Sequence, residues 1–421
     1  MTYNQATANQ VGLIVLLLIL TLAVALVARS LRLPYTLALV LAGLVIGVSP
    51  LFPNLHLDPD LVLFLFLPAL LFEGAWNVET KLLRRDGLLV FAFAVPGLIL
   101  SLLVIAAVVH FGAALAWLPA LLVGAVVSPT DPLAIISLLR QLGLPDRLLT
   151  ILEGESLFND GVGAAAFEII LAALLTSLHA PSEFADLPAP MVILKVAWLL
   201  GGGILIGAII GYVVSRLVRV VNDPLLETTV TFSVAYGAYI LGVLVGTSGL
   251  LAVVSAGLLL GSYGKRTGMS ERTIELVDSV WEFTGYVANS FLFLLLGVSL
   301  GSTALGPALP AILWAVVGLL AGRALMIYAL VPLYDQLVRR RVLGLTVDPI
   351  PRVWRPLMLL SGLRGALSLA LILSVPTLVP GRDQLKLIVY GVVLVTLVGQ
   401  GLGLRLLLPR LPFLRARPAE P

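Results

Sequence analysis

Long apolar runs separated by short polar segments fill the chain from residue 11 onward. Most of these runs reach the ~20 residues that a helix needs to cross the hydrocarbon core of a bilayer. They predict an all-α polytopic membrane protein with about thirteen transmembrane helices, of which the ninth is short and the fifth, sixth, tenth and eleventh are long enough to tilt or break. The predicted spans are residues 11–29, 34–52, 60–76, 87–110, 114–140, 148–178, 190–216, 225–245, 248–262, 273–301, 308–337, 354–378 and 384–407.

Composition indicates that the bilayer is the solvent. Of the 421 residues, 60% are hydrophobic and only 12% are charged, whereas soluble domains are roughly half apolar and a quarter charged. The chain has no cysteine, which excludes disulfides, thiolate metal sites and a cysteine nucleophile. Basic residues stand at the ends of apolar runs and form no solvated patch, so we expect no nucleic-acid partner.

The distribution of Lys and Arg predicts the orientation. If the N-terminus lies outside, most of the 26 basic residues fall on inside segments, as the positive-inside rule requires. We therefore expect a multi-pass protein of the inner (plasma) membrane with a cytoplasmic C-terminus. We interpret the first apolar stretch, Val11–Val27, as a retained helix, because no basic segment precedes it and no convincing cleavage context follows.

Prolines predict a helix break in the fifth span, at Ser128-Pro129-Thr130-Asp131-Pro132. Prolines remove amide donors and block helical continuation. Carbonyls exposed at membrane depth are tolerated only where protein or a water-filled cavity receives them, and such breaks line the binding sites of secondary transporters. Glycines beside Arg364 predict a second break in the twelfth span, so spans 4–6 and 11–13 would form an inverted repeat.

Oxygen-bearing side chains gather in the sixth span. Glu155 and Asn159 are separated by one helical turn, as are Ser156 and Asp160, so the four lie on adjoining strips of one helix. At helical rise, Asp160 falls near mid-membrane. Glu73, at the end of the third span, is a further deep carboxylate. Such hard oxygens suit alkali and alkaline-earth cations.

Two arginines, Arg323 and Arg364, lie in the middle of predicted spans. Arginine keeps its charge, so each needs a partner, and we expect the pairs Glu155–Arg323 and Asp131–Arg364. For any single buried aspartate, a purely structural hydrogen-bonding role is the alternative.

The deep acids outnumber the embedded arginines, so at least part of the cluster lacks a fixed counter-charge. Burial disfavours the charged form of a lone carboxylate, which then holds a proton or a cation. Because the two ligands cannot occupy one carboxylate together, their competition is the simplest mechanism of cation–proton exchange.

Four stretches resemble the monovalent cation:proton antiporters, in particular the electroneutral, sodium/proton exchanger-like branch typified by NhaP. They follow one another from the third span to the twelfth, and taken jointly the pattern is highly specific. The stretches are Leu71-Phe72-Glu73-Gly74, Ser128-Pro129-Thr130-Asp131-Pro132, Glu153-Gly154-Glu155-Ser156-Leu157-Phe158-Asn159-Asp160-Gly161 and Gly362-Leu363-Arg364-Gly365-Ala366-Leu367-Ser368-Leu369.

The resemblance implies a cation site. Asp160 would be the carboxylate that exchanges Na⁺ for H⁺. Thr130, Ser156 and Glu73 would complete the shell of the monovalent cation, Thr130 through its backbone carbonyl. Asn159 would orient the site where the electrogenic branch has a second aspartate.

The resemblance also implies structural charges and an architecture. Glu155 with Arg323 would be an ion pair that holds the core helices, and Asp131 and Arg364 would compensate broken helices that cross near the midplane. It further implies a thirteen-helix antiporter fold, a homodimer, elevator-like alternating access and one-for-one, electroneutral exchange of Na⁺ (or Li⁺ or K⁺) for H⁺, with no cofactor.

We expect one transmembrane antiporter domain over residues 1–421. Its core or transport bundle would comprise about 87–178 and 308–407, and its interface or dimerisation helices about 11–76 and 190–301. Since the sequence ends soon after Pro409, we expect no large cytosolic regulatory tail and a prokaryotic protein.

Two other functions are alternatives. A cation channel would share the apolar composition and the deep acids but would not need proton competition. An intramembrane aspartyl protease would use Asp131 and Asp160 but gives Arg323 no role. We expect that the protein is not an enzyme. We also expect no nucleotide partner, because no nucleotide domain is evident.

Glycines at every fourth position of the seventh span predict close helix packing. They are Gly203, Gly207 and Gly211.

Overall fold

The computed structural model describes residues 5–31, 35–49, 59–132, 136, 139–140, 143–180, 187–221, 223–301, 303–340 and 347–400. Within these ranges the chain forms helices joined by turns and short extended segments, and no β-strand occurs among them. The prediction of an all-α architecture is therefore confirmed for the described part of the chain. The end of the last predicted span, residues 401–407, lies outside it.

Each predicted span contains one helix or several consecutive helices. Some neighbouring α-helices are joined by a π-helical turn and form one continuous helical element, as at η2 (Phe93–Gly97). This turn contains Pro96, which lacks an amide donor and therefore suits an irregular turn. The α-helices are α1 (Gln5–Leu31), α2 (Tyr35–Val48), α3 (Pro59–Leu61), α4 (Leu67–Asn77), α5 (Thr80–Ala92), α6 (Leu98–Ala113), α7 (Trp117–Val127), α9 (Asp146–Ser177), α10 (Ala189–Ala197), α11 (Gly203–Leu217), α12 (Pro224–Leu244), α13 (Gly249–Leu259), α14 (Lys265–Thr267), α15 (Glu271–Gly301), α16 (Leu309–Arg339), α17 (Arg355–Leu360), α18 (Ala366–Ser374) and α19 (Arg382–Val395).

Within the described part of the chain, five helical elements are long and apolar enough to cross a membrane on their own. They are Thr80–Ala113, Asp146–Ser177, Pro190–Val220, Glu271–Gly301 and Gly306–Arg339. Shorter apolar helices supply further candidate crossings, so the number thirteen stays a prediction.

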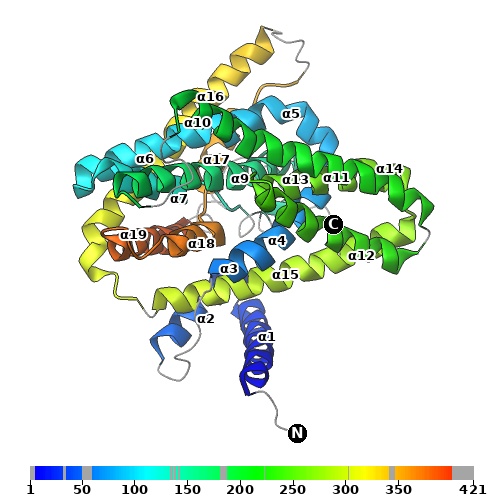
Figure 1. Ribbon diagram of the computed structural model, residues 1–421, viewed down its shortest axis with the longest axis horizontal. Helices are drawn as coiled ribbons and strands as arrows, with labels where there is room; N and C mark the ends of the chain where they lie inside the picture. Colours follow the sequence, from blue (N-terminus) through cyan, green and yellow to red (C-terminus); the bar gives the residue numbers. More distant parts are fainter. Residues whose placement is uncertain are drawn as a thin grey trace.

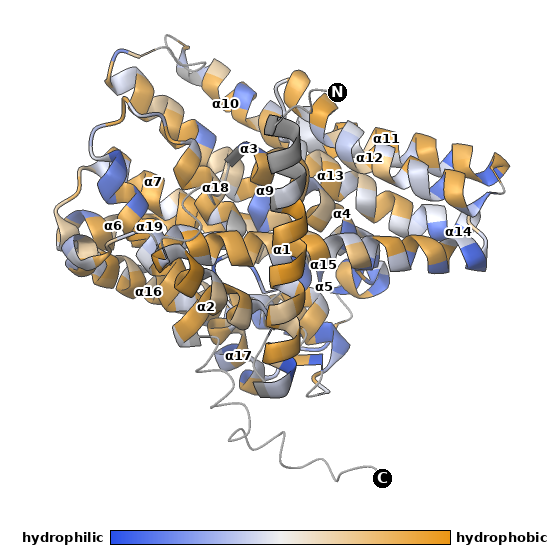
Figure 2. Cartoon of the chain, turned by 90° about the horizontal axis from the view of Figure 1, so that it is seen from below, coloured by the Kyte–Doolittle hydropathy of each residue, from blue (hydrophilic) through white to orange (hydrophobic). Residues whose placement is uncertain are grey.

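The helices form two groups that the chain visits alternately. α6, α7, α16, α18 and α19 lie on one side of the molecule, whereas α11, α12, α13 and α14 lie on the other (Figure 1 and Figure 2). α4 and α9 lie between them: α4 packs on α13 and α15, and α9 packs on α5, α7 and α13. α15 also runs along α2.

Glycines let helices approach closely within the second group. A Cβ added at any of three glycines of α11 would contact backbone of the segment that contains α13, at distances shorter than real side chains show. The facing pairs are Gly203 with Ser248, Gly207 with Ala252 and Gly211 with Ala256. The predicted packing role of these glycines is confirmed.

Helical breaks occur at the two predicted places. α7 ends at Val127, and the chain over Ser128–Pro132 is not helical; α17 and α18 are likewise separated by the segment Ser361–Gly365. By contrast, α9, α15 and α16 are continuous, although their spans were long enough to break, and α16 even contains Pro332.

Candidate functional site

Thr130 sits at the centre of the first break, and α9 holds each of its polar groups. Its backbone N–H donates to Asn159 Oδ1 at 3.4 Å, and its hydroxyl accepts from Asn159 Nδ2 at 2.9 Å. The same hydroxyl donates to Glu155 Oε1 at 3.5 Å, while Ser156 Oγ donates to the Thr130 carbonyl at 2.7 Å. The one-turn spacing along α9 therefore produces a ladder of donors and acceptors that fixes an otherwise unpaired backbone.

The two breaks touch through their main chains. Asp131 N–H donates to the Leu363 carbonyl at 2.8 Å. A Cβ at Gly365 would collide with the Asp131 side chain, so the second break needs glycine at this position. Segments more than 200 residues apart in sequence thus satisfy each other's backbone groups.

Arg323 of α16 makes the expected ion pair with Glu155. Both nitrogens at the end of the guanidinium donate to the Glu155 carboxylate, and the group also donates to the Met358 carbonyl from Nε at 3.2 Å and Nη2 at 3.0 Å. The two side chains are 3% and 2% exposed. A buried bidentate pair of this kind joins α9, α16 and the end of α17.

Arg364 differs from the expectation. No direct ion pair between Asp131 and Arg364 occurs among the described residues. Instead, Arg364 Nε donates to the Val127 carbonyl at 2.6 Å, and Nη1 donates to the Gly362 carbonyl. The reason is local: α7 and α17 both stop here and leave acceptors that a guanidinium can bind. Arg364 therefore compensates helix ends, and the expected direct contact with Asp131 is wrong.

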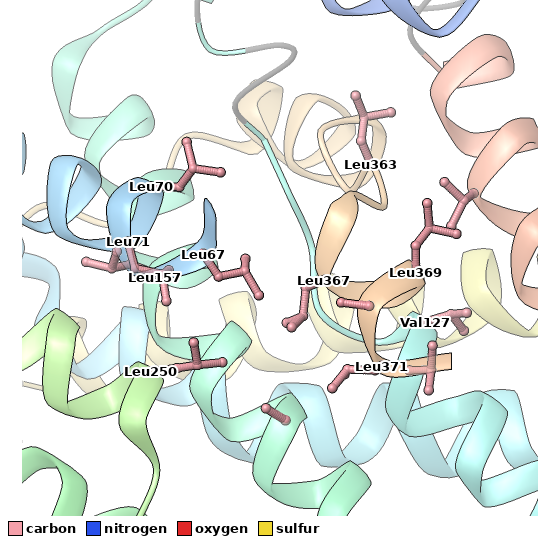
Figure 3. Close-up of a cluster of buried hydrophobic side chains, with 14 of the residues drawn as sticks. Leu67, Leu70, Leu71, Val127, Leu157, Leu250, Leu363, Leu367, Leu369 and Leu371 are labelled. Carbon is pink, nitrogen blue, oxygen red and sulfur yellow. The ribbon is translucent and has the colours of Figure 1, made fainter. Parts of the chain in front are cut away.

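Apolar side chains surround the crossing. In Figure 3 the extended chain beyond Val127 runs past Leu367, with Leu71 and Leu157 on one side and Leu369 of α18 on the other. Each of these labelled side chains is buried. A low-dielectric wall strengthens the electrostatic interactions of any charge placed between the breaks.

A cavity of about 600 Å³ opens beside the breaks. Oxygen-bearing residues from several elements line it: Glu73, Thr130, Asp131, Ser156, Asp160 and Ser368. For the Asp160 carboxylate, no hydrogen bond or ion pair occurs within the described part of the chain, although α9 holds its neighbour Asn159 firmly.

Glu73, near the end of α4, lines the same cavity. Its carboxylate accepts from Asn77 Nδ2 at 3.0 Å and lies against Gly285 of α15, where a Cβ would approach it to 3.2 Å. The structure thus brings the expected cation residues to one cavity, with Asp160 and Ser156 supplied by α9, Thr130 by the first break and Glu73 by α4. Within the described ranges there is no cluster of three His, Cys, Asp or Glu residues able to hold a metal tightly.

Several contributors were absent from the sequence-based site. Ser368 and Asn289 also line the cavity, although neither was predicted as a cation ligand. A further network fixes the end of α9: Arg147 donates to the Asp86 carboxylate at 2.8 and 2.6 Å, and Tyr334 donates to it at 3.1 Å. No spacing rule could reveal these contacts, because the partners come from helices distant in sequence.

Comparison with known proteins adds to this geometry. The family described as sodium/hydrogen exchanger, transmembrane, matches residues 14–410. The chain belongs to this family. The Na⁺/H⁺ antiporter ApNhaP of Aphanothece halophytica is 36% identical over 382 residues, which are 90% of this chain and 70% of that protein. The Na⁺/H⁺ antiporter NhaS2 of a Synechocystis strain is 36% identical over 407 residues, 97% of this chain and 71% of that one.

A solved structure shows the same fold. The sodium proton antiporter MjNhaP1 from Methanocaldococcus jannaschii, at pH 8, superimposes with a TM-score of 0.70 and covers 96% of this chain and 97% of its own, at 22% identity. The expected resemblance to the NhaP branch and the antiporter fold are therefore confirmed. The sodium/hydrogen exchanger family consists of membrane transporters and is not an enzyme family.

Proposed function

We propose that this chain is a secondary transporter that exchanges Na⁺ for H⁺ across the membrane, with Asp160 as the group that carries either ion. One observation supports this most directly. The Asp160 carboxylate lines a cavity at the crossing of two broken segments, and no cation of the described residues neutralises it. Membership of the sodium/hydrogen exchanger family disfavours a cation channel.

Competition at one carboxylate produces the exchange. An isolated charge costs free energy in an apolar surrounding, so Asp160 is stable there when it holds a proton or a cation. A cation would bind hard oxygens from Thr130, Ser156 and Glu73. Asn159 and Glu155 act indirectly, since their hydrogen bonds position Thr130.

The stoichiometry follows from the number of exchanging groups. Asn159 is committed to Thr130 and carries no charge, which leaves Asp160 as the exchanging acid of α9 in this scheme. One carboxylate that releases one proton for one Na⁺ moves no net charge. Exchange would therefore be electroneutral, and an imposed membrane potential would not change its rate.

Asp160→Asn tests the assignment. The amide cannot release a proton, so Na⁺-driven proton movement in proteoliposomes should fall to the level of protein-free vesicles. In the unaltered protein, the apparent KM for Na⁺ should rise as the pH is lowered, because protons occupy the shared carboxylate. Normal exchange by the Asn variant would overturn the role of Asp160.

A matched control separates this role from general charge loss. Glu282 also lines the cavity but is exposed. Glu282→Gln should therefore retain exchange, with at most a moderate increase in KM. If both variants lost exchange equally, the special role of Asp160 would be contradicted.

The proposed function also includes an oligomeric state and an orientation in the membrane. We propose a homodimer in the inner membrane, with the N-terminus outside and the C-terminus in the cytoplasm, which the asymmetry of Lys and Arg supports. A transport bundle over about 87–178 and 308–407 would move relative to interface helices over about 11–76 and 190–301 and thereby contribute to pH regulation. The two helical groups of Figure 1 are compatible with such a division.

A further inference from the structure

Two arginines are held by tyrosines where α11 ends: Arg216 lies in its last turn, and Arg219 lies in η4 (Val218–Val220), which follows directly. Arg216 donates to Tyr212 Oη from Nε at 3.3 Å and from Nη2 at 3.1 Å, and Arg219 Nη2 donates to Tyr263 Oη at 3.1 Å. The rings of Tyr212 and Tyr263 are stacked, with centroids 5.8 Å apart. The guanidinium carbon of Arg216 lies 5.5 Å from the centroid of the Tyr212 ring, and that of Arg219 lies 5.6 Å from the centroid of the Tyr263 ring, as in cation–π contacts.

The arrangement directs both positive charges to one place. Arg216 follows Tyr212 by one turn of α11 and Arg219 lies in η4, so the two hydroxyl–guanidinium bonds and the stacked rings bring both charges together where α11 ends. Close packing fixes the site from beneath, because Gly268 approaches the backbone of Arg219. The two arginines therefore need little reordering to bind a ligand.

No carboxylate neutralises this pair within the described part of the chain. The nearest acid in sequence, Asp223, is engaged in capping α12, where it accepts from Leu225 N–H at 2.9 Å and Leu226 N–H at 3.2 Å. Lys265, close to Tyr263 in sequence, is paired with Asp278 at 2.9 Å. Two exposed guanidiniums with free donors thus suit a phosphate group.

The surroundings identify the phosphate as that of a lipid. Apolar side chains on both sides of the arginines are exposed: Leu217 by 59%, Val220 by 84%, Leu225 by 71% and Leu226 by 56%. A freely dissolved phosphate would gain nothing from them, whereas acyl chains would cover them. The end of the bundle near α14 is also where hydrophilic and hydrophobic residues meet in Figure 2.

We propose that Arg216 and Arg219, with Tyr212 and Tyr263, bind the phosphate headgroup of an anionic phospholipid at the membrane–water boundary. Tyrosine suits this boundary because its ring is apolar and its hydroxyl is polar. Basic groups at a helix end attract anionic lipids from the leaflet. The site lies on α11, η4 and η5 (Leu260–Gly264). None of its four residues lines the Asp160 cavity, so the site is independent of the proposed exchange.

The test measures lipid binding and needs no transport. The full chain is purified in detergent, titrated with phosphatidylglycerol or phosphatidylcholine, and the bound lipid is counted by native mass spectrometry. The double variant Arg216→Gln/Arg219→Gln should bind phosphatidylglycerol about 30-fold more weakly, which corresponds to about 2 kcal/mol for two basic groups. Its binding of phosphatidylcholine should equal that of the unaltered protein.

Arg339→Gln/Arg340→Gln is the matched control, because it removes two exposed arginines from the end of α16. It should keep the original affinity for phosphatidylglycerol. Equal affinities of the two double variants would overturn the proposal. Equal binding of phosphatidylglycerol and phosphatidylcholine would also overturn it. In a thermal unfolding assay, equal stabilisation by inorganic phosphate alone and by phosphatidylglycerol would do the same, since the ligand would then not be an anionic lipid.

Discussion

Thr130 illustrates how a broken helix can be kept in order by single residues. Its N–H, carbonyl and hydroxyl are all bound by side chains of α9, and Thr130 is only 4% exposed. Loss of any one bond would leave a buried polar group unsatisfied, at a cost of about 1–3 kcal/mol. The cation site therefore depends on residues that need not touch the cation.

Glu155→Ala should destabilise the protein more than it changes cation affinity. The substitution leaves Arg323 buried without its carboxylate, which costs about 3–5 kcal/mol in comparable pairs. The thermal midpoint in detergent should fall clearly, while the KM for Na⁺ of the surviving protein changes little, because Asn159 and Ser156 still hold Thr130. Glu155→Leu combined with Arg323→Met should recover most of the loss, because no charge is then stranded. An unchanged midpoint for Glu155→Ala would contradict a stabilising role of the pair.

At the scale of elements, glycine spacing decides how closely helices pack. Gly203, Gly207 and Gly211 put α11 directly against backbone that belongs to Ser248 and α13. Similar contacts join α2 to α15, where Gly43 meets the Leu294 carbonyl. Without a strong hydrophobic driving force between helices in lipid, such close van der Waals contact is a main source of association.

Gly207→Ala should weaken the packing of α11 on α13. The added Cβ would overlap the Ala252 carbonyl, and overpacking of this kind costs about 1–3 kcal/mol. Thermal unfolding in detergent measures the loss. Gly201→Ala is the control, since nothing lies within 4 Å of a Cβ there. Equal thermal midpoints of the two alanine variants would contradict a packing role of Gly207.

The sequence predicted the elements of the site better than their contacts. Prolines and glycines predicted both breaks, because they act on their own backbone within one or two residues. The Glu155–Arg323 pair was also predicted, since a buried arginine requires an acid. The partner of Arg364 was not, because carbonyls freed at helix ends leave no trace in the residue pattern. The Asp86–Arg147–Tyr334 network was missed because it depends on how α5, α9 and α16 are rotated against one another.

Across the whole molecule, the cavity combines acids from α4, α9 and α15 with a single arginine among the residues that line it in the described part of the chain. Glu73, Asp278 and Glu282 come from α4 and α15, and Glu153 comes from α9. Arg140 lines the same cavity and donates to Glu153 Oε1 at 2.7 Å. A cavity lined mainly by acids raises the local concentration of cations, and Arg140 opposes that effect.

Arg140→Gln should lower the apparent KM for Na⁺ by about twofold, because one exposed positive charge at ~10 Å changes the energy of a cation by roughly half a kcal/mol. The difference should shrink at high ionic strength. The KM values of both proteins are obtained from exchange rates in proteoliposomes at low and high concentrations of choline chloride. Arg339→Gln, at the end of α16, is the control and should leave the KM unaltered. A rise in KM on replacing Arg140 would contradict this electrostatic account.

The junction of the two breaks is made by main-chain atoms of Asp131 and Leu363. Almost any amino acid could supply an amide and a carbonyl there, so the crossing imposes few demands on the sequence beyond the small residue at Gly365. Lineages can therefore exchange cavity-lining side chains that do not hold Thr130, such as Ser368 and Asn289, while the scaffold persists. New ion preferences become accessible to evolution without the invention of a new architecture.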